Sequence, residues 1–442
     1  MTPSLPDRRS GKAAMSRRPS EILSLAALVA ASFFVAATAR GDAAGPWLEE
    51  GDEINRVATA VRIIKSDEYI YDGPSSSAQR RGSAAREARL PFFGSRTGPG
   101  CRSKWYSVGP SAWVCGDSVE LTRGKPVPAD ARTFEPSSDG LPYRYYFVGP
   151  SGSAGYKRLV EADIAEPSFN LEPGFAVAIS EERVVEGHRY GLTGNQLWVP
   201  MRDLGATRSI AFQGSDVPDG TTDTMPLAWV TTQSARIFAA PSSARATGES
   251  LVEFTKVDAF EQAGQFEKFT RIADGKWLRS KDIARPTIAA PPDDVDLDAG
   301  ERWIDVELAT QTLIAYEGRK PVFSTIVSTG KGRVGSGNET PRGSHRIWVK
   351  LASTNMDNLE DENANRYYRI ENVPYVQFFD KGVGIHGAFW HRGFGHVRSH
   401  GCVNLAPLDA QRLYWFTSPR LPAGWTAVLP TAREKGSIVR VR

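Results

Sequence analysis

Short apolar runs that end at glycine, proline or aspartate recur along the first 300 residues of this chain. The pattern Ile-x-x-x-Pro-Ser-Ser occurs at 70–76 and 237–243, and a Trp-Val or Trp-Leu pair is followed by Asp-Leu or Asp-Ile at 198–204 and 277–283. Apolar runs of this length between turn residues are typical of strands. The sequence therefore predicts a mainly β protein. The expected small β modules cover 53–125, 130–215 and 226–287.

Composition excludes several classes of protein. Of the 442 residues, 40% are hydrophobic and 10% are aromatic, enough to bury cores and to argue against wholesale disorder. The formal net charge is only +3, so no nucleic-acid partner is expected. Three cysteines cannot supply a zinc site of four cysteine ligands.

The N-terminus has the features of an export segment. Five basic residues precede an apolar run from Ile22 to Ala39, and small residues close that run. This order is typical of a secretory signal, so we predict one within 1–44 and an exported protein of the periplasm or cell envelope. The alternative is an uncleaved membrane anchor, because this run of 18 residues is just long enough to span a bilayer.

Export changes how the cysteines are interpreted. Cys101 and Cys115 lie in strand-like sequence with turn residues between them, and in an oxidising compartment they are expected to form a disulfide. Two buried free thiols are the alternative. Cys402 is then left unpaired, which makes it a candidate reactive thiol.

The last third of the chain divides into three segments. Residues 288–300 are acidic and rich in proline, which predicts a linker. A further domain is expected at 302–430, with strand-like runs and a helix that begins near Pro407 and stops by Pro419. The end, 431–442, carries four basic residues against Glu434 and is predicted to be a solvated basic tail.

Five of the six histidines follow residue 340, and Cys402 lies among them. Three chemistries compete for this cluster. A metal site lacks a recognised ligand spacing, so neither a metal nor another cofactor is expected. Histidines packed in a β core would account for any one residue, but poorly for the glycine-rich run at 399–402. The third is a cysteine nucleophile, whose thiolate a neighbouring imidazole can hold before it protonates the leaving group.

The run Ser399-His400-Gly401-Cys402-Val403-Asn404, preceded by His386, resembles the catalytic domain of the L,D-transpeptidases. Val327 to Lys331 and the Thr340-Pro341-Arg342-Gly343 turn are similar to that family as well. The resemblance covers 302–430 and implies a β-sandwich of mixed sheets with a short helix. The upstream modules resemble bacterial SH3-like barrels, weakly for the middle one, and either bind the cell wall or only position the next domain.

The resemblance also implies roles for individual residues. Cys402 is expected to be the nucleophile and His386 the proton acceptor and donor. His400 and Gly401 would shape the oxyanion loop, with the N–H groups of Gly401 and Cys402 facing the oxyanion. Loop support is expected from Ser399 and Asn404. The candidate substrate-binding residues are Arg398, Asn404, Trp390 and Tyr375.

The implied reaction is acyl transfer on peptidoglycan stem peptides, with release of D-alanine and formation of 3→3 cross-links. Acylation by a carbapenem is a further expectation. Two alternatives stay open. Water could replace the amine acceptor, giving an L,D-carboxypeptidase or endopeptidase, or the chain could be a non-catalytic cell-wall-binding protein.

Overall fold

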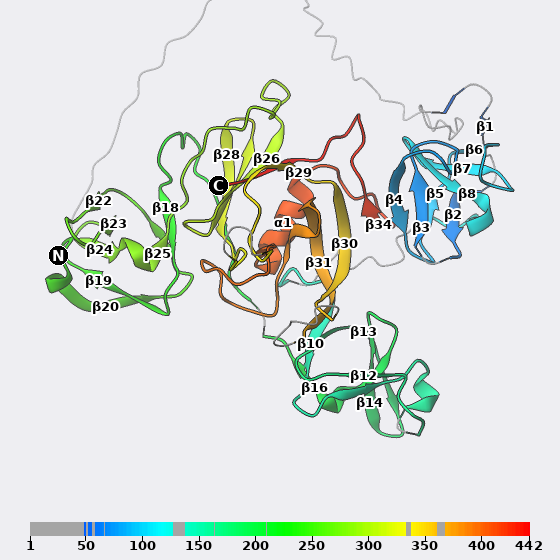
Figure 1. Cartoon of the computed structure of the whole chain (residues 1–442), viewed down its shortest axis with the longest axis horizontal. Helices are drawn as coiled ribbons and strands as arrows, with labels where there is room; N and C mark the ends of the chain where they lie inside the picture. Colours follow the sequence, from blue (N-terminus) through cyan, green and yellow to red (C-terminus); the bar gives the residue numbers. More distant parts are fainter. Residues whose placement is uncertain are drawn as a thin grey trace, which may run out of the picture. The chain divides into compact units, whose positions relative to one another are not determined.

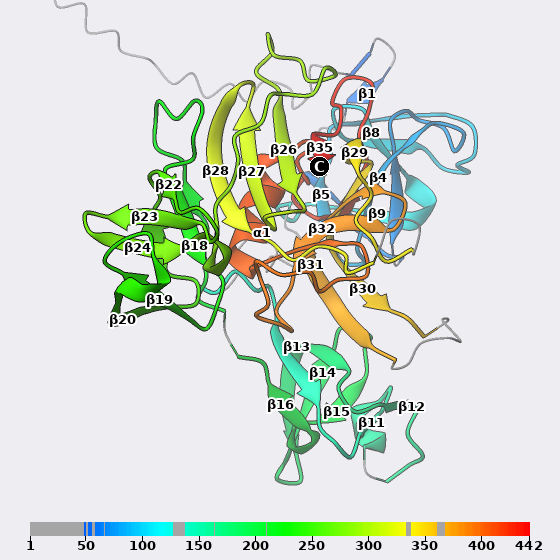
Figure 2. The same cartoon turned by 60° about the vertical axis from the view of Figure 1, so that its left-hand side comes forward.

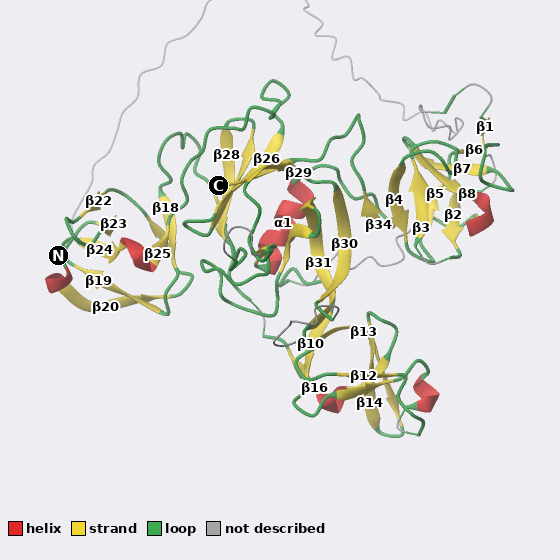
Figure 3. Ribbon diagram, in the orientation of Figure 1, coloured by secondary structure: helices red, strands yellow, loops and turns green. Residues whose placement is uncertain are grey.

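The computed structural model describes residues 48–49, 52–54, 58–65, 67–126, 138–162, 164–208, 210–332, 337–359 and 367–442. The predicted export signal or anchor at 1–44 lies outside these residues. In the described part of the chain, no helix has both the length and the apolar character needed to cross a membrane. Strands predominate (Figure 3), which confirms the mainly β fold class.

The first module consists of a small sheet, β5-β2-β9, and of the strand run β1-β6-β7-β8-β3-β4, which continues from β4 into the C-terminal strand β34 (Trp425–Val428). A disulfide joins Cys101 to Cys115 at the end of β8, which is the predicted pairing. The strands are β1 (Glu53–Ile54), β2 (Ala60–Ile63), β3 (Glu68–Tyr71), β4 (Arg80–Ala84), β5 (Arg89–Pro91), β6 (Gly94–Arg96), β7 (Trp105–Gly109), β8 (Ala112–Cys115) and β9 (Val119–Thr122).

The next two modules are also built from short, mostly antiparallel strands. The second contains β10 (Arg144–Val148), β11 (Ser153–Gly155), β12 (Phe169–Leu171), β13 (Ala176–Val185), β14 (His188–Thr193), β15 (Trp198–Pro200) and β16 (Leu204–Ala206). The third contains β18 (Leu227–Val230), β19 (Ser234–Phe238), β20 (Ala246–Val252), β21 (Lys256–Asp258), β22 (Gln262–Ala263), β23 (Phe269–Ala273), β24 (Lys276–Arg279) and β25 (Ile283–Ala284).

The repeated tryptophan–aspartate pattern corresponds to one local structure. In the second and third modules the tryptophan lies on a strand, a single 3-10 turn follows, and the next strand begins directly after the aspartate. Trp113 on β8 is followed by the same strand–turn–strand order. The three modules therefore share this closing unit, while their likeness to SH3 barrels stays a prediction.

The C-terminal domain contains two mixed sheets and the helix α1 (Pro407–Phe416) (Figures 1 and 2). The first sheet has the order β17-β28-β27-β26-β35-β29, with β17 (Ser215–Asp216), β26 (Arg302–Glu307), β27 (Thr312–Glu317), β28 (Lys320–Ile326), β29 (Gly343–Arg346) and β35 (Ile438–Val441). The second runs β34-β30-β31-β32-β33, with β30 (Val349–Asp357), β31 (Arg369–Asp380), β32 (Val383–Gly387), β33 (Val403–Leu405) and β34 (Trp425–Val428).

The core of this domain lies between the two sheets and is completed by α1. Val306 and Phe323 from the first sheet, Ile385 from the second and Leu413 from the helix are buried in one cluster. Pro407 occupies the first turn of α1, where its missing N–H costs no hydrogen bond. The helix ends at Phe416, before Pro419, as the sequence predicts.

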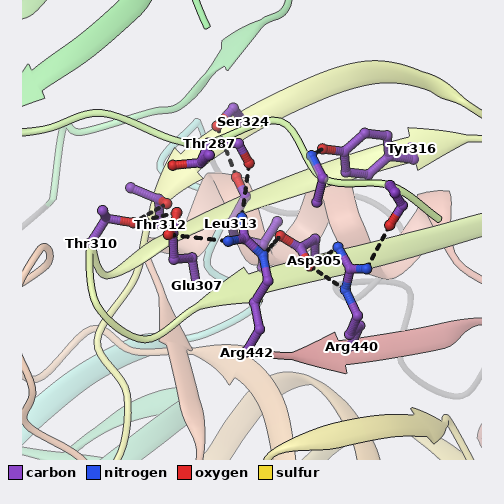
Figure 4. Close-up of polar contacts among 12 residues, drawn as sticks. Thr287, Asp305, Glu307, Thr310, Thr312, Leu313, Tyr316, Ser324, Arg440 and Arg442 are labelled. Atoms are coloured by element: carbon purple, nitrogen blue, oxygen red, sulfur yellow. Dashed lines mark hydrogen bonds and ion pairs between the residues drawn. The ribbon is translucent and has the colours of Figure 1, made fainter. Parts of the chain in front are cut away.

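The predicted solvated tail at 431–442 is wrong for its last residues. Ile438, Val439 and Val441 are buried, because β35 pairs with β26 on one side and β29 on the other. The alternate residues Arg440 and Arg442 both bind the buried carboxylate of Asp305 (Figure 4). Charge alone suggested a solvated end, but the strand alternation of apolar and paired basic residues completes the sheet.

The predicted linker at 288–300 packs against this domain. The Ala289 N–H donates to the hydroxyl of Tyr316, and the guanidinium of Arg440 donates to the carbonyl of Ala290. Val295 is buried in the core cluster that contains Trp303. The segment is therefore held along the first sheet over part of its length.

Candidate active site

Two parallel strands bring the predicted nucleophile and base onto one face. The β32–β33 register pairs Ile385 with Val403 and His386 with Asn404. Side chains paired in register share a face of the sheet, and so do side chains two residues apart on a strand. Cys402 directly precedes β33, so its side chain belongs to the face that carries His386 and Asn404.

The loop before Cys402 depends on a glycine. Gly401 has φ +126°, a conformation that only glycine adopts readily, and an added Cβ would lie 3.2 Å from the carbonyl oxygen of Glu339. The Gly401 N–H donates to Ser399 Oγ at 3.1 Å, and Ser399 Oγ in turn donates to the carbonyl of Cys402. Ser399 therefore closes the loop on itself.

The Thr-Pro-x-Gly turn supports the same loop from the other side. The Thr340 hydroxyl donates to the carbonyl of Gly401 at 2.7 Å and accepts the Gly330 N–H at 2.9 Å. Thr340 is buried, so these two bonds are shielded from water. The turn thus connects the segment after β28 to the cysteine loop.

Burial sets the protonation of the reacting groups. His386 is 2% exposed, and desolvation lowers the pKa of its imidazole to about 4. Burial raises the pKa of the Cys402 thiol, although the residue keeps partial exposure. Both groups are therefore neutral at pH 7. Desolvation thus favours the neutral thiol and the neutral imidazole in this resting arrangement, and a thiolate held by the imidazole stays a prediction.

The imidazole of His386 is oriented by one backbone contact. Its Nδ1 lies 3.2 Å from the carbonyl oxygen of Gly387, which can only accept a hydrogen bond. A neutral ring therefore carries its hydrogen on Nδ1, and Nε2 is left as the basic nitrogen. Trp390 stacks on the ring, with centroids 5.6 Å apart and an interplanar angle of 27°.

A second histidine of the site, His391, is half-buried. Desolvation, with a smaller contribution from the Arg398 charge, lowers the pKa of His391 to about 4. Its Nδ1 accepts the Gly393 N–H, so Nε2 carries the hydrogen of the neutral ring. The amide of Asn404 lies 2.9 Å from that Nε2. Its oxygen fits there better than its nitrogen, since an amide is assigned from its hydrogen-bond network.

Several predicted roles need correction. Tyr375 is fully buried beside Tyr414 in the core, so it cannot line a substrate cleft. Two N–H groups were predicted to face the oxyanion. The Gly401 N–H already donates to Ser399 Oγ, so the Cys402 N–H remains as the candidate donor. Asn404 is buried and holds His391 instead of facing a substrate.

The remaining predicted residues lie around the loop. His400 is exposed and stacks on Tyr368, with centroids 5.8 Å apart and an interplanar angle of 16°. Arg398 is exposed directly before Ser399. Trp390 is half-buried, so it covers His386 and keeps part of its ring accessible.

The structure adds residues that sequence reasoning missed. Gln311 holds Thr329 by two hydrogen bonds, and the backbone carbonyl of Thr329 accepts the N–H of Ser399. The resemblance at Val327 to Lys331 was the available signal for Thr329. For Gln311 and Tyr368 nothing in the sequence indicated a role. Gln311 acts on the loop only through Thr329, and Tyr368 reaches His400 from a distant part of the chain.

The described residues contain one group of potential metal ligands, Cys101, Cys115 and Asp117. The two sulfurs are bonded to each other, so they cannot act as thiolate ligands.

Residues 301–429 match the YkuD family, described as the L,D-transpeptidase catalytic domain. The chain is therefore similar to the L,D-transpeptidases over that range, which is less than half of its length. No curated protein sequence is significantly similar to the chain.

Solved structures of L,D-transpeptidases are similar to parts of the chain. An enzyme from Stackebrandtia nassauensis is 28% identical over 32% of this chain and 55% of its own, with a TM-score of 0.22. The Enterococcus faecium catalytic domain acylated by ertapenem is 27% identical over 29% of this chain and 95% of its own, with a TM-score of 0.22. An enzyme from Mycobacterium smegmatis is 16% identical over 60% of this chain and 99% of its own, with a TM-score of 0.25. The first structures matched are covered over about half of their length.

Proposed function

We propose that the C-terminal domain is an L,D-transpeptidase of an exported protein. It would transfer an acyl group from a peptidoglycan tetrapeptide stem to an amine, release D-alanine and form 3→3 cross-links. The observation that carries this proposal is the shared strand face of Cys402 and His386, within the range that matches the family. Nucleophilic acyl transfer requires a thiol within reach of a basic group, and the partly exposed Cys402 shares its strand face with the buried imidazole of His386.

In the first step, Cys402 Sγ attacks the carbonyl carbon of the bond between the third stem residue and the terminal D-alanine. The thiol proton moves to His386 Nε2 as the C–S bond forms. It then moves to the nitrogen of D-alanine as the C–N bond breaks. Because both side chains start neutral, proton transfer must accompany the attack instead of preceding it.

In the second step, an amine nitrogen attacks the thioester carbonyl and the C–S bond breaks. The sulfur recovers a proton, which the amine loses by way of His386. The Cys402 N–H is the backbone donor we assign to the oxyanion in both steps.

The proposal is tested by mass spectrometry of the intact, full-length protein with ertapenem. One adduct is expected on the parent and none on Cys402→Ala; the other two cysteines form a disulfide and cannot react. Products from purified stem peptides then identify the acceptor. A 3→3 dimer supports transfer, a hydrolysed tripeptide supports the carboxypeptidase, and an unmodified Cys402 with no product overturns the enzyme assignment.

A further inference from the structure

An open groove of about 760 Å³ lies between the third β module and the loop that follows β32. The module contributes one wall, Thr231, Thr232, Gln233, Ser234 and Glu253. The loop contributes the other, Arg392, Gly393, His396 and Arg398. The proposed reaction assigns no role to this groove.

The two walls are joined by direct contacts. His396 Nε2 donates to the carbonyl of Thr231 at 2.7 Å, which fixes the loop against the module. Next to it, Gly395 has φ +84°, and an added Cβ would lie 2.5 Å from Thr231 Cγ2. Beneath the groove, Trp229 of the module and Phe394 of the loop are fully buried in one core cluster. The groove is therefore a built feature of the joined domains.

The groove is cationic and has an unused hydrogen-bonding group. Arg392 and Arg398 are exposed, and within the described residues neither guanidinium pairs with a carboxylate. Glu253 is the single acidic residue of the lining. The Thr232 hydroxyl is buried and has no hydrogen-bond partner among the described residues. A buried hydroxyl without a partner is costly, so a ligand that supplies one would be stabilised there.

The groove adjoins the candidate active site. Arg398 immediately precedes Ser399, which closes the cysteine loop. The charge of Arg398 also acts on His391, whose ring contacts Asn404, the register partner of His386. A ligand that neutralised Arg398 would therefore act on the polar groups that surround the catalytic imidazole.

We infer that this groove binds the free carboxylates of a peptide, and that the third β module thereby forms one wall of the substrate site. This inference rests on the proposed function and names the incoming stem peptide as the occupant. Guanidinium groups match the planar carboxylate with paired hydrogen bonds, and the Thr232 hydroxyl can donate a further one. Glu253 in the opposite wall disfavours a polyanion such as a phosphate polymer.

Isothermal titration calorimetry on full-length Cys402→Ala protein tests this inference without turnover. The probes are a purified disaccharide-tetrapeptide, the same fragment with its carboxylates converted to carboxamides, and inorganic phosphate. Arg392→Gln should weaken binding of the carboxylate form about tenfold and leave the carboxamide form unaffected, because the charge-assisted hydrogen bonds between guanidinium and carboxylate are lost. Thr232→Val should weaken it less. The matched control, Arg236→Gln, changes an exposed arginine of the same module outside the groove lining.

Equal binding of the carboxylate form by the Cys402→Ala parent and Arg392→Gln would overturn the inference. Phosphate binding that Arg392→Gln weakens, with both peptide forms bound alike, would also overturn it, since the groove would then be a general anion site. Ertapenem acylation of the Cys402-containing protein separates the two proposals. An acylated Cys402 with no groove effect leaves the transpeptidase standing, whereas an inert Cys402 with a clear groove effect leaves a peptide-binding site without that chemistry.

Discussion

Two clusters of buried ionisable groups in the C-terminal domain differ in their hydrogen-bond partners, which are charged in one cluster and neutral in the other. Asp305 is 1% exposed and accepts hydrogen bonds from Arg440 Nε at 2.6 Å and Arg442 Nε at 2.8 Å. His386 is equally buried, but its hydrogen bond goes to a neutral carbonyl. Within the described residues, no charged side chain hydrogen-bonds to His386 or Cys402.

The difference separates a scaffold from a reactive site. A buried charge survives when oppositely charged groups replace its water, and the Asp305 cluster satisfies that condition while it ties the last strand to the sheet. At the cysteine no described residue brings a counter-charge into hydrogen-bond contact, so burial shifts both pKa values toward the neutral forms. The Cys402 thiol and the His386 imidazole are therefore both neutral at rest, and charge develops on them only when a substrate is present.

The largest expected effect is on the reactive side of this comparison. Cys402→Ala removes the only thiol outside the disulfide, so acylation by ertapenem should fall by at least about 10³-fold, to the background of the assay. Stability should change little, because the side chain is partly exposed and its contact with the carbonyl of Gly382, at 3.8 Å, is weak. Mass spectrometry measures the first effect and thermal unfolding the second. Residual acylation near the parent rate would contradict the nucleophile assignment.

Asp305→Asn tests the scaffold side. It removes the charge that two guanidiniums share, and breaking a buried pair costs about 3–5 kcal/mol; we expect about 3 kcal/mol because both arginines are partly exposed. Denaturant unfolding measures the loss, and ertapenem acylation under native conditions should be kept. Asp298→Asn, at an exposed position of the preceding segment, is the control and should be neutral. Equal stability of the two variants would show that the pairing is dispensable.

The same comparison explains how much the sequence could predict. The cysteine loop was predictable because its requirements are local: a glycine at a positive φ, a serine two residues before it and a cysteine directly after it. The mainly β class and the repeated tryptophan–aspartate units were predictable for the same reason, since short apolar runs between turn residues define them.

The predictions that were wrong concern residues whose surroundings depend on contacts with distant parts of the chain. Arg440 and Arg442 look solvated in the sequence, and their partner Asp305 lies 135 and 137 residues earlier. Tyr375 looks like a possible cleft residue until β31 packs it against α1. The neutral state of the thiol and imidazole was equally out of reach, because burial of His386 depends on Trp390 and on the surrounding sheet, not on its neighbours in sequence.

A pH profile of thiol alkylation tests whether Cys402 is neutral at rest, with an expected change in rate of about 100-fold. With the pKa of Cys402 raised by burial, the thiolate fraction stays small and grows tenfold per pH unit below that pKa. The iodoacetamide rate constant should therefore rise about 100-fold from pH 6 to pH 8 without a plateau. His386→Gln should keep this slope, since the imidazole holds no thiolate at rest. A flat rate across this range would mean that the pair is charged, as at Asp305.

Thr340 provides the smallest and most discriminating test. Thr340→Val keeps the shape but removes the hydroxyl that donates to the Gly401 carbonyl and accepts the Gly330 N–H. A buried group left without a partner costs about 1–3 kcal/mol, so unfolding should be easier by an amount in that range. Acylation should slow about tenfold, since about 1.4 kcal/mol of lost positioning corresponds to that factor. Thr340→Ser retains the hydroxyl and should recover most of both losses. If Thr340→Val behaves like the parent and Thr340→Ser shows the losses, methyl packing and not the hydroxyl holds the loop. The cysteine side of the comparison is then organised like an ordinary core, without the polar support described above.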